Sequence, residues 1–348
     1  MTHAVKRSFQ SWGRISQGCY DIAVPAFRDE LPALVMRSAG QPTLAVGLGR
    51  SYGDSCLNSG GSLIEMTRLN RIITADFNAG IMHVEAGISL DELLRVIVPR
   101  GWFVSTTPGT RFVTIGGAVA NDVHGKNHHG AGSFGCAVRR LELIRSDGTR
   151  VELSASAASP LFRATVGGLG LTGVISTIEF QLTPIRSAYL DVERIPFGHV
   201  REFFEINAES VQHFEHTVAW VDCANGRLGR GIMQRARWCT DGDLATHRSS
   251  SALSIPSRMP RLVPQRLALK IFNALYYHLN TIGRTRQRVH YAPFFYPLDA
   301  VGNWNRLYGR RGFYQYQCLI PAVAAPATIG EILSQVARAG SGSCLAVL

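Results

Sequence analysis

The sequence predicts an α+β fold divided into two domains. Its 348 residues exceed the usual size of a single domain, and 46% of them are hydrophobic, which is enough to form buried cores. In the first half, short apolar runs alternate with turn residues, and a capped helical segment interrupts them. These observations favour mixed strands and helices over a disordered chain.

Four strand-like runs lie between residues 43 and 87. Asn78-Ala79-Gly80 separates the last two runs and is typical of a turn. Ser89 then begins a predicted helix, because Glu92 stands three residues later and completes a capping box. Gly101 is expected to end this helical stretch. The four runs are TLAVGLG, SLIEMTRL, RIITADF and IMHVEAG, and the apolar stripe of the helix is Leu90, Leu93, Leu94 and Ile97.

The remaining elements of the first domain lie between residues 114 and 184. A second helix is predicted to begin at Thr114, and residues 138–153 read as a hairpin closed on Asp147-Gly148. Residues 159–182 predict a short helix, a glycine-rich loop and a strand that ends near Pro184. We therefore expect one domain over residues 1–185 and another over residues 186–348.

Cysteine spacing and hydropathy indicate where in the cell the protein is located. The seven cysteines are scattered without a C-x-x-C pair, which fits neither a disulfide framework nor a zinc site and favours a reducing compartment. The N-terminus lacks the apolar core of a signal peptide, and no run reaches the roughly 18 apolar residues that span a bilayer. We expect a protein that is soluble or peripheral to the inner membrane, at its cytoplasmic or periplasmic face.

Positive charge is concentrated in one part of the chain. The formal net charge is +11, and no acidic residue occurs between Asp243 and Asp299. Apolar and aromatic residues interrupt this basic segment (residues 248–288), which suits a phosphate-bearing lipid or membrane surface as well as nucleic acid. Of these partners we expect the membrane surface and no nucleic acid. A solvated, arginine-rich surface is the alternative. Its basic residues are Arg248, Arg258, Arg261, Arg266, Lys270, Arg284, Arg286 and Arg288.

Three glycine-rich loops carry the functional signal. The first loop, GLGRSYGD at residues 47–54, follows an apolar strand, and its backbone N–H groups can converge on a pyrophosphate. Its spacing is not the Rossmann G-x-G-x-x-G, so that a plain turn would explain it if it stood alone. The second loop, residues 108–135, places glycines at a helix start, where orphan N–H groups favour an anion. The third loop is VGGLGLTGV, residues 166–174, and three such loops in one domain indicate a flat or charged ligand.

These stretches resemble the vanillyl-alcohol-oxidase type of FAD-binding flavoproteins. GLGRSYGD, PGTRFVTIGGAVANDVHGKNHHGAGSFG, ATVGGLGLTGVI and YPLDAVGNWNRLYGRRGFYQYQCLIP carry the resemblance, which extends from about Trp12 to the C-terminus. It implies a two-domain α+β fold with a PCMH-type FAD-binding domain and a substrate domain built on an antiparallel sheet. It also implies that FAD is lined by Gly47, Leu48, Gly49, Arg50, Ser51, Tyr52, Gly53, Asp54, Gly109, Thr114, Ile115, Gly116, Gly117, Asn121, Asp122, Val123, His124 and Ile175.

The resemblance further implies how the flavin is held. Members of this family often attach it covalently to a histidine in the first loop, but this chain has Arg50 and Ser51 there, so we expect non-covalent FAD. His124 and Lys126 resemble the pair beside the isoalloxazine. Gln315, Gln317 and Tyr296 resemble residues that face the substrate, with Gln315 and Gln317 on a predicted FYQYQ strand. Similar enzymes have the tyrosine one position earlier, so that its hydroxyl has either moved or been lost.

The implied reaction is oxidation of the ribose 2′-hydroxyl of a polyprenylphosphoryl-D-ribose to a keto sugar, before a partner keto-reductase, in synthesis of cell-wall arabinan precursors. His124 is the candidate base, because an imidazole exchanges protons near neutral pH, although it can be purely structural. Lys126 is the candidate for binding the substrate phosphate or stabilising reduced flavin. An oxidase of free sugar alcohols or aldonolactones and a catalytically silent flavin-binding protein are the alternatives.

Two further expectations complete the prediction. His128 and His129 are adjacent and have no carboxylate at H-E-x-x-H spacing, so we expect no metal site. Similar enzymes continue beyond the position of Leu348 with a tyrosine and a lysine that contact the flavin. The chain is therefore expected to be C-terminally truncated, with a substrate domain that is incomplete at its C-terminal end and an activity that is left open.

Overall fold

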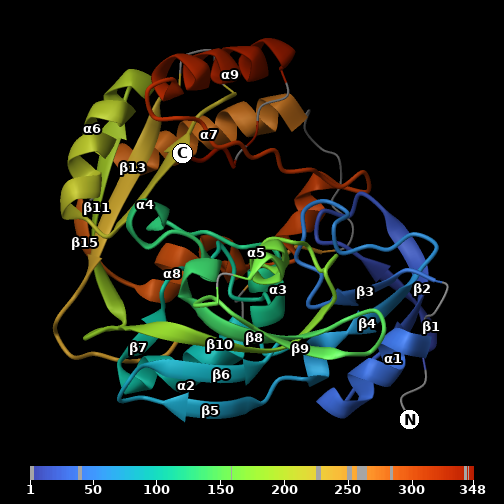
Figure 1. The fold of residues 1–348 in the computed structure, drawn as a ribbon. Coiled ribbons are helices and arrows are strands. Elements are labelled where there is room, and N and C mark those ends of the chain that lie inside the picture. The colour runs from blue at the N-terminus through green and yellow to red at the C-terminus, as the bar shows by residue number, and fades with distance from the viewer. Residues whose placement is uncertain are drawn as a thin grey trace. The chain divides into compact units, whose positions relative to one another are not determined.

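The computed structural model forms two compact units, each described by itself below. It describes residues 4–37, 41–157, 159–224, 229–248, 253–256, 265–282, 285–340, 343 and 345–348. The first unit comprises Met1–Ala188, Asp243–Met259 and Tyr291–Gln315, and the second comprises Tyr189–Gly242, Pro260–His290 and Tyr316–Leu348. Figure 1 labels many of the elements of both.

The first unit is built on two main sheets, and its short strands β14 (Leu253–Ser254) and β16 (Val301–Gly302) form a parallel pair besides. The smaller has the order β1-β2-β4-β3, in which only the β1–β2 pair is antiparallel. The larger has the order β5-β6-β10-β8-β9, with β7 also paired to β10, and is antiparallel. The strands are β1 (Val5–Gln10), β2 (Gln17–Ala23), β3 (Thr43–Val46), β4 (Ser62–Glu65), β5 (Ile72–Asp76), β6 (Ile81–Glu85), β7 (Trp102–Val104), β8 (Val138–Ile144), β9 (Arg150–Ser154) and β10 (Val174–Pro184).

Short helices connect these strands, and the local sequence signals place them. Ser89 caps α2 through the complete capping box with Glu92, and Gly101 ends the following turn in the left-handed region at φ 78°. Thr114 caps α3, and Gly148 closes the β8–β9 hairpin at φ 80°. These predictions are confirmed. The helices of this unit are α1 (Leu31–Arg37), α2 (Leu90–Ile97), α3 (Ile115–Ala120), α4 (His128–Ala131), α5 (Pro160–Thr165) and α8 (Tyr291–Phe295).

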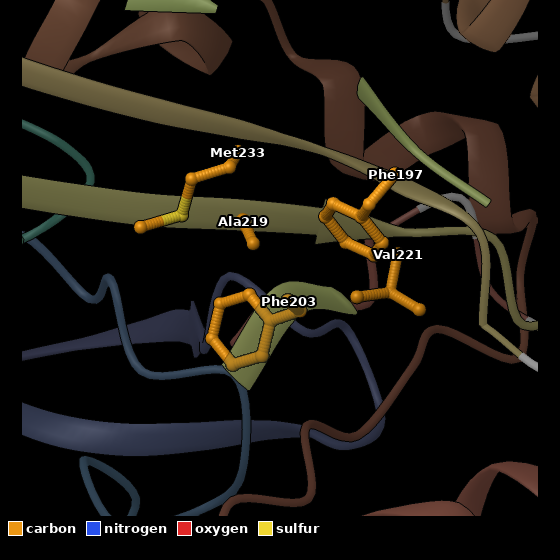
Figure 2. Packing of buried hydrophobic residues seen from close by; sticks show 5 residues of the cluster. All are labelled: Phe197, Phe203, Ala219, Val221 and Met233. Carbon is orange, nitrogen blue, oxygen red and sulfur yellow. The ribbon is translucent and has the colours of Figure 1, made fainter. Parts of the chain in front are cut away.

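The second unit is an antiparallel sheet with a helix on each face. Phe203 of α6 packs on Ala219 and Val221 of the sheet, together with Phe197 and Met233, as Figure 2 shows. The side chains of a strand alternate between its two faces, so Trp220 and Asp222 point the other way, where α7 contacts them. The sheet order is β12 (His216–Val221), β13 (Gly231–Trp238), β11 (Tyr189–Phe197) and β15 (Arg286–His290), and the helices are α6 (Val200–His213), α7 (Gln265–Ile282) and α9 (Ala325–Ala339).

The structure corrects two expectations about the second half. A single boundary at residue 185 is wrong, because the chain returns twice to the first unit, through residues 243–259 and 291–315. The predicted FYQYQ strand is also absent: residues 312–320 have no regular secondary structure. Alternation of apolar and polar residues alone does not form a strand where no neighbouring strand pairs with it.

Buried ionic contacts hold the returning segments in the first unit. His247 Nε2 lies 2.8 Å from Asp91 Oδ1, which also accepts a hydrogen bond from Arg111 Nε at 2.6 Å. Asp299 accepts hydrogen bonds from the Thr110 hydroxyl at 2.6 Å and the Arg111 backbone N–H at 2.9 Å. Burial alone would raise the pKa of Asp91, but hydrogen bonds from His247, Arg111 and Arg95 lower it below its usual range.

Candidate functional site

The three glycine-rich loops meet around α3. A Cβ on Gly47 of the first loop would collide with the hydroxyl of Thr114, the residue that caps α3. At the other end of α3, the backbone N–H groups of Gly167 and Leu169 in the third loop donate to the carbonyls of Val119 and Ala120, at 3.0 and 2.8 Å. Loops that are far apart in sequence thus form one continuous backbone surface, referred to below as the loop cluster.

Several glycines in the loop cluster face open space. A Cβ added at Gly53 or Gly109 would meet no heavy atom within 4 Å, and one at Gly117 would meet only the Thr114 hydroxyl, at 3.0 Å. Gly116 differs, because its Cβ would lie 2.9 Å from that of Ala86, so this residue is required for packing on the end of β6. The open glycines leave room for a ligand to approach the backbone.

Arg50 places a half-buried cation in the first loop. Its guanidinium lies 4.0 Å from the ring centroid of Trp12 and 5.2 Å from that of Phe112. Burial lowers its pKa, and its buried Nε has no hydrogen-bond partner among the described residues. Beside it, burial raises the pKa of Tyr52 to about 12, so that its hydroxyl stays protonated at neutral pH. A buried N–H group without a hydrogen bond is costly, so the Nε of Arg50 is a place where a ligand group could complete this site.

His124 is exposed on the turn that follows α3. The turn is held by Asp122, whose carboxylate accepts from the Gly135 N–H and the Ser133 hydroxyl, both at 2.8 Å. Residue 124 also forms an isolated antiparallel bridge with Ser133. Asp122 therefore positions the loop. Of the other residues predicted to line FAD, Ile115 and Ile175 have side chains that are buried in the core.

Lys126 is directed into the protein. Its ammonium donates to the carbonyl oxygen of Phe294 and lies 4.3 Å from the centroid of that residue's ring. Burial of the ammonium lowers the pKa of Lys126 from 10.5 to about 7. These contacts tie the second loop to α8, a function that the sequence did not indicate.

Comparisons with known proteins decide the family. Residues 22–154 match the model of an FAD binding domain. The chain is 35% identical to decaprenylphosphoryl-β-D-ribose oxidase of Mycolicibacterium smegmatis over 98% of its own length and 77% of that protein's. The chain belongs to the decaprenylphosphoryl-β-D-ribose oxidase family. It is also 31% identical to L-gulonolactone oxidase of Mus musculus, over 53% of this chain and 42% of that one.

Membership of the decaprenylphosphoryl-β-D-ribose oxidase family, with the matched domain, makes the protein an FAD-binding oxidoreductase and confirms the predicted α+β fold. The loop cluster fits FAD: its open glycines can admit the pyrophosphate, and Arg50 supplies a cation whose Nε has no hydrogen-bond partner among the described residues. No group of three or more metal-ligating side chains occurs within the described ranges. Among the described residues, no helix is long and apolar enough to cross a membrane.

The three residues expected to face the substrate differ in their exposure to solvent. Tyr296 is only 1% exposed, and its hydroxyl is 2.7 Å from that of Thr107, so the structure contradicts its predicted substrate contact. The adjoining apolar rings of Phe295 and Tyr291 enclose it and raise its pKa well above the usual value. Gln315 and Gln317 are exposed, and their predicted role in a member of this oxidase family stays a prediction.

The pKa of Lys126 predicts a pH dependence of stability. Between about pH 7 and 10 the unfolded chain binds a proton at this lysine that the folded chain lacks, so the free energy of unfolding should rise with pH in that range. Lys126→Met removes the group and should flatten this rise. Urea unfolding of both proteins across the range measures it, and an equal slope in the two would show that Lys126 keeps an ordinary pKa.

Proposed function

We propose that this protein oxidises the ribose 2′-hydroxyl of a polyprenylphosphoryl-D-ribose to the 2′-keto sugar. The observation that carries the proposal is the 35% identity to decaprenylphosphoryl-β-D-ribose oxidase along 98% of this chain, supported by a loop cluster that fits FAD. The match to L-gulonolactone oxidase covers only 53% of the chain, so an aldonolactone or free sugar alcohol is the weaker candidate.

Alcohol oxidation separates a proton from a hydride. Bound FAD supplies the hydride acceptor, and the protein must remove the hydroxyl proton. His124 is the candidate acceptor of this proton, because its imidazole is exposed on a turn fixed by Asp122. Because the His124 side chain is exposed, it can pass the proton directly to solvent.

Lys126 has a different proposed role from the one expected. Its ammonium is bound to the Phe294 carbonyl, so it acts as a positioning residue that fixes the second loop against α8. The keto product would be the substrate of a separate keto-reductase, because reduction of the ketone is what converts the ribose configuration to the arabinose one.

Substrate reduction of the flavin tests the proposed function. The purified protein is mixed without oxygen with polyprenylphosphoryl-D-ribose, with D-ribose or with L-gulonolactone, and the visible absorbance of the flavin is followed. We expect bleaching with the lipid-linked sugar at a rate well above that with the other two. Faster bleaching with the lactone would favour the alternative, and no bleaching with any of them would favour a silent flavin-binding protein.

The absence of a histidine from the first loop predicts non-covalent flavin. Acid or heat denaturation should release all flavin into the supernatant, because neither Arg50 nor Ser51 offers the imidazole that such attachment uses in related proteins. The absorbance of the supernatant and of the redissolved pellet measures the partition. Flavin that stays with the washed polypeptide would contradict this prediction.

A further inference from the structure

Helix α7 directs its apolar side chains outward. Within this one helix the exposed fractions are 51% for Phe272, 56% for Leu275, 64% for Leu279 and 84% for Ile282. These residues recur at intervals of three and four, so they share one face of the helix, together with Ile271 at 57%. A helix on the surface of a globular protein usually buries such a face. We call these five residues the outer face of α7.

The opposite side of α7 attaches it to the sheet through polar and aromatic groups. Asn273 is fully buried and donates to Asp222 Oδ1 at 2.9 Å. Tyr276 packs on Trp220 with ring centroids 4.8 Å apart, and the guanidinium of Arg230 lies 4.5 Å from the Tyr277 ring. The orientation of the helix is therefore fixed by these contacts, and the outer face is exposed as a consequence of them.

Helix α7 lies in a segment of the sequence that has no acidic residue. The sequence has no aspartate or glutamate between residues 243 and 299, and Lys270 of α7 is exposed. Two other members of the basic segment are already neutralised: Arg286 Nε donates to Asp191 at 2.8 Å, and Arg288 Nε donates to Asp241 at 2.7 Å. Arg258, Arg261, the side chain of Arg266, and Arg284 lie outside the described residues. Because the two arginines of β15 are paired with carboxylates, we place the predicted membrane contact on α7 instead.

We propose that α7 binds the surface of an anionic bilayer by inserting its outer face into the headgroup region. The apolar side chains would enter the boundary between headgroups and acyl chains, and the lack of acidic residues around α7 would favour an anionic surface. This inference rests on the proposed function, because a polyprenyl-linked substrate resides in a membrane and an enzyme that acts on it must reach that surface.

Charge favours a lipid surface over a second copy of the chain. Two copies that buried the outer face against each other would bring two acid-free, basic helices together without any carboxylate in α7 to pair with them. An anionic bilayer supplies both the apolar interior and the negative charge that this helix lacks.

Vesicle co-sedimentation tests the proposal. The FAD-loaded protein is mixed with vesicles of equal parts phosphatidylglycerol and phosphatidylcholine. Leu275→Glu/Leu279→Glu should weaken binding at least about tenfold, because two inserting leucines are lost. Leu275→Gln/Leu279→Gln should weaken it without adding charge. The matched control is Val5→Glu/Met36→Glu, two exposed apolar residues of the first unit, and it should bind as the original protein does.

Each outcome bears on one proposal. Equal binding by all variants, or an equal loss in the control pair, would overturn insertion by α7. A dimer in sedimentation velocity that the Leu275 and Leu279 variants dissolve, without vesicle binding, would assign the face to a second copy. Flavin reduction by a soluble, short-chain phosphoryl ribose should be the same in all variants. Failure of that reduction with vesicle binding intact would overturn the proposed function alone.

Discussion

Replacing Gly117 by valine is expected to abolish FAD binding. The space beyond its Cβ position is open except for the Thr114 hydroxyl at 3.0 Å, and it adjoins the start of α3. The first N–H groups of α3 donate to acceptors within the protein, so a phosphate there would be held by the helix dipole and the open space. A branched side chain there would occupy the volume of the pyrophosphate without disturbing the core. The flavin-to-protein absorbance ratio after desalting should fall to the background.

Gly330→Val provides the matched control for this experiment. Gly330 also lies in a helix, α9, and a Cβ there would meet no heavy atom within 4 Å, so the substitution carries a similar cost in helix propensity. It should leave the flavin content unchanged. Normal flavin content in the Gly117→Val protein would show that the pyrophosphate lies elsewhere, and loss in both variants would indicate general destabilisation.

The elements of the first unit could be predicted because their signals are local. The Ser89 and Glu92 capping box fixes the start of α2, and Asp147-Gly148 fixes the β8–β9 hairpin, each within a few residues. The return of residues 243–259 depends instead on His247 reaching Asp91, which lies 156 positions earlier. No short pattern in the sequence carries a pairing at that separation.

The loop cluster shows the same division. Glycine clustering identified the three loops, because it is visible within a few residues of the sequence. The proximity of Gly47 to Thr114 and the contact of Lys126 with Phe294 depend on tertiary packing, so the sequence could identify these residues but not their partners. Tyr296 was misplaced for this reason: its hydroxyl suggested a site, whereas the surrounding aromatic rings bury it.

The outer face of α7 shows that an apolar repeat predicts a helix but not whether its apolar face is buried. Its apolar repeat is that of an ordinary amphipathic helix, from which burial of that face would be expected. Whether the apolar face is buried depends on which contacts the opposite face of the helix makes. Here Asn273 on that opposite face donates a hydrogen bond to the buried Asp222. The sequence indicated a lipid surface through its missing carboxylates, but it could not distinguish α7 from the arginines of β15, which are paired with Asp191 and Asp241.

His124→Ala is expected to retain FAD but to slow its reduction by roughly 10²–10⁴, the usual cost of losing an acid–base group. The imidazole is exposed, and the turn that carries it is held by Asp122 and Ser133, so the loop should keep its conformation without it. Stopped-flow measurement of anaerobic flavin reduction by the lipid-linked sugar isolates this step from reoxidation.

The control variant for this experiment is His129→Ala, an exposed histidine of α4 that the proposed reaction does not use. It should reduce its flavin at the original rate. A slow reaction in the His124→Ala protein that becomes faster as pH rises would support the base role further, because hydroxide or a buffer base can partly replace a missing general base. Unchanged reduction in that variant would make His124 a structural residue of the second loop, and the proton acceptor would then have to be sought among other groups near the flavin.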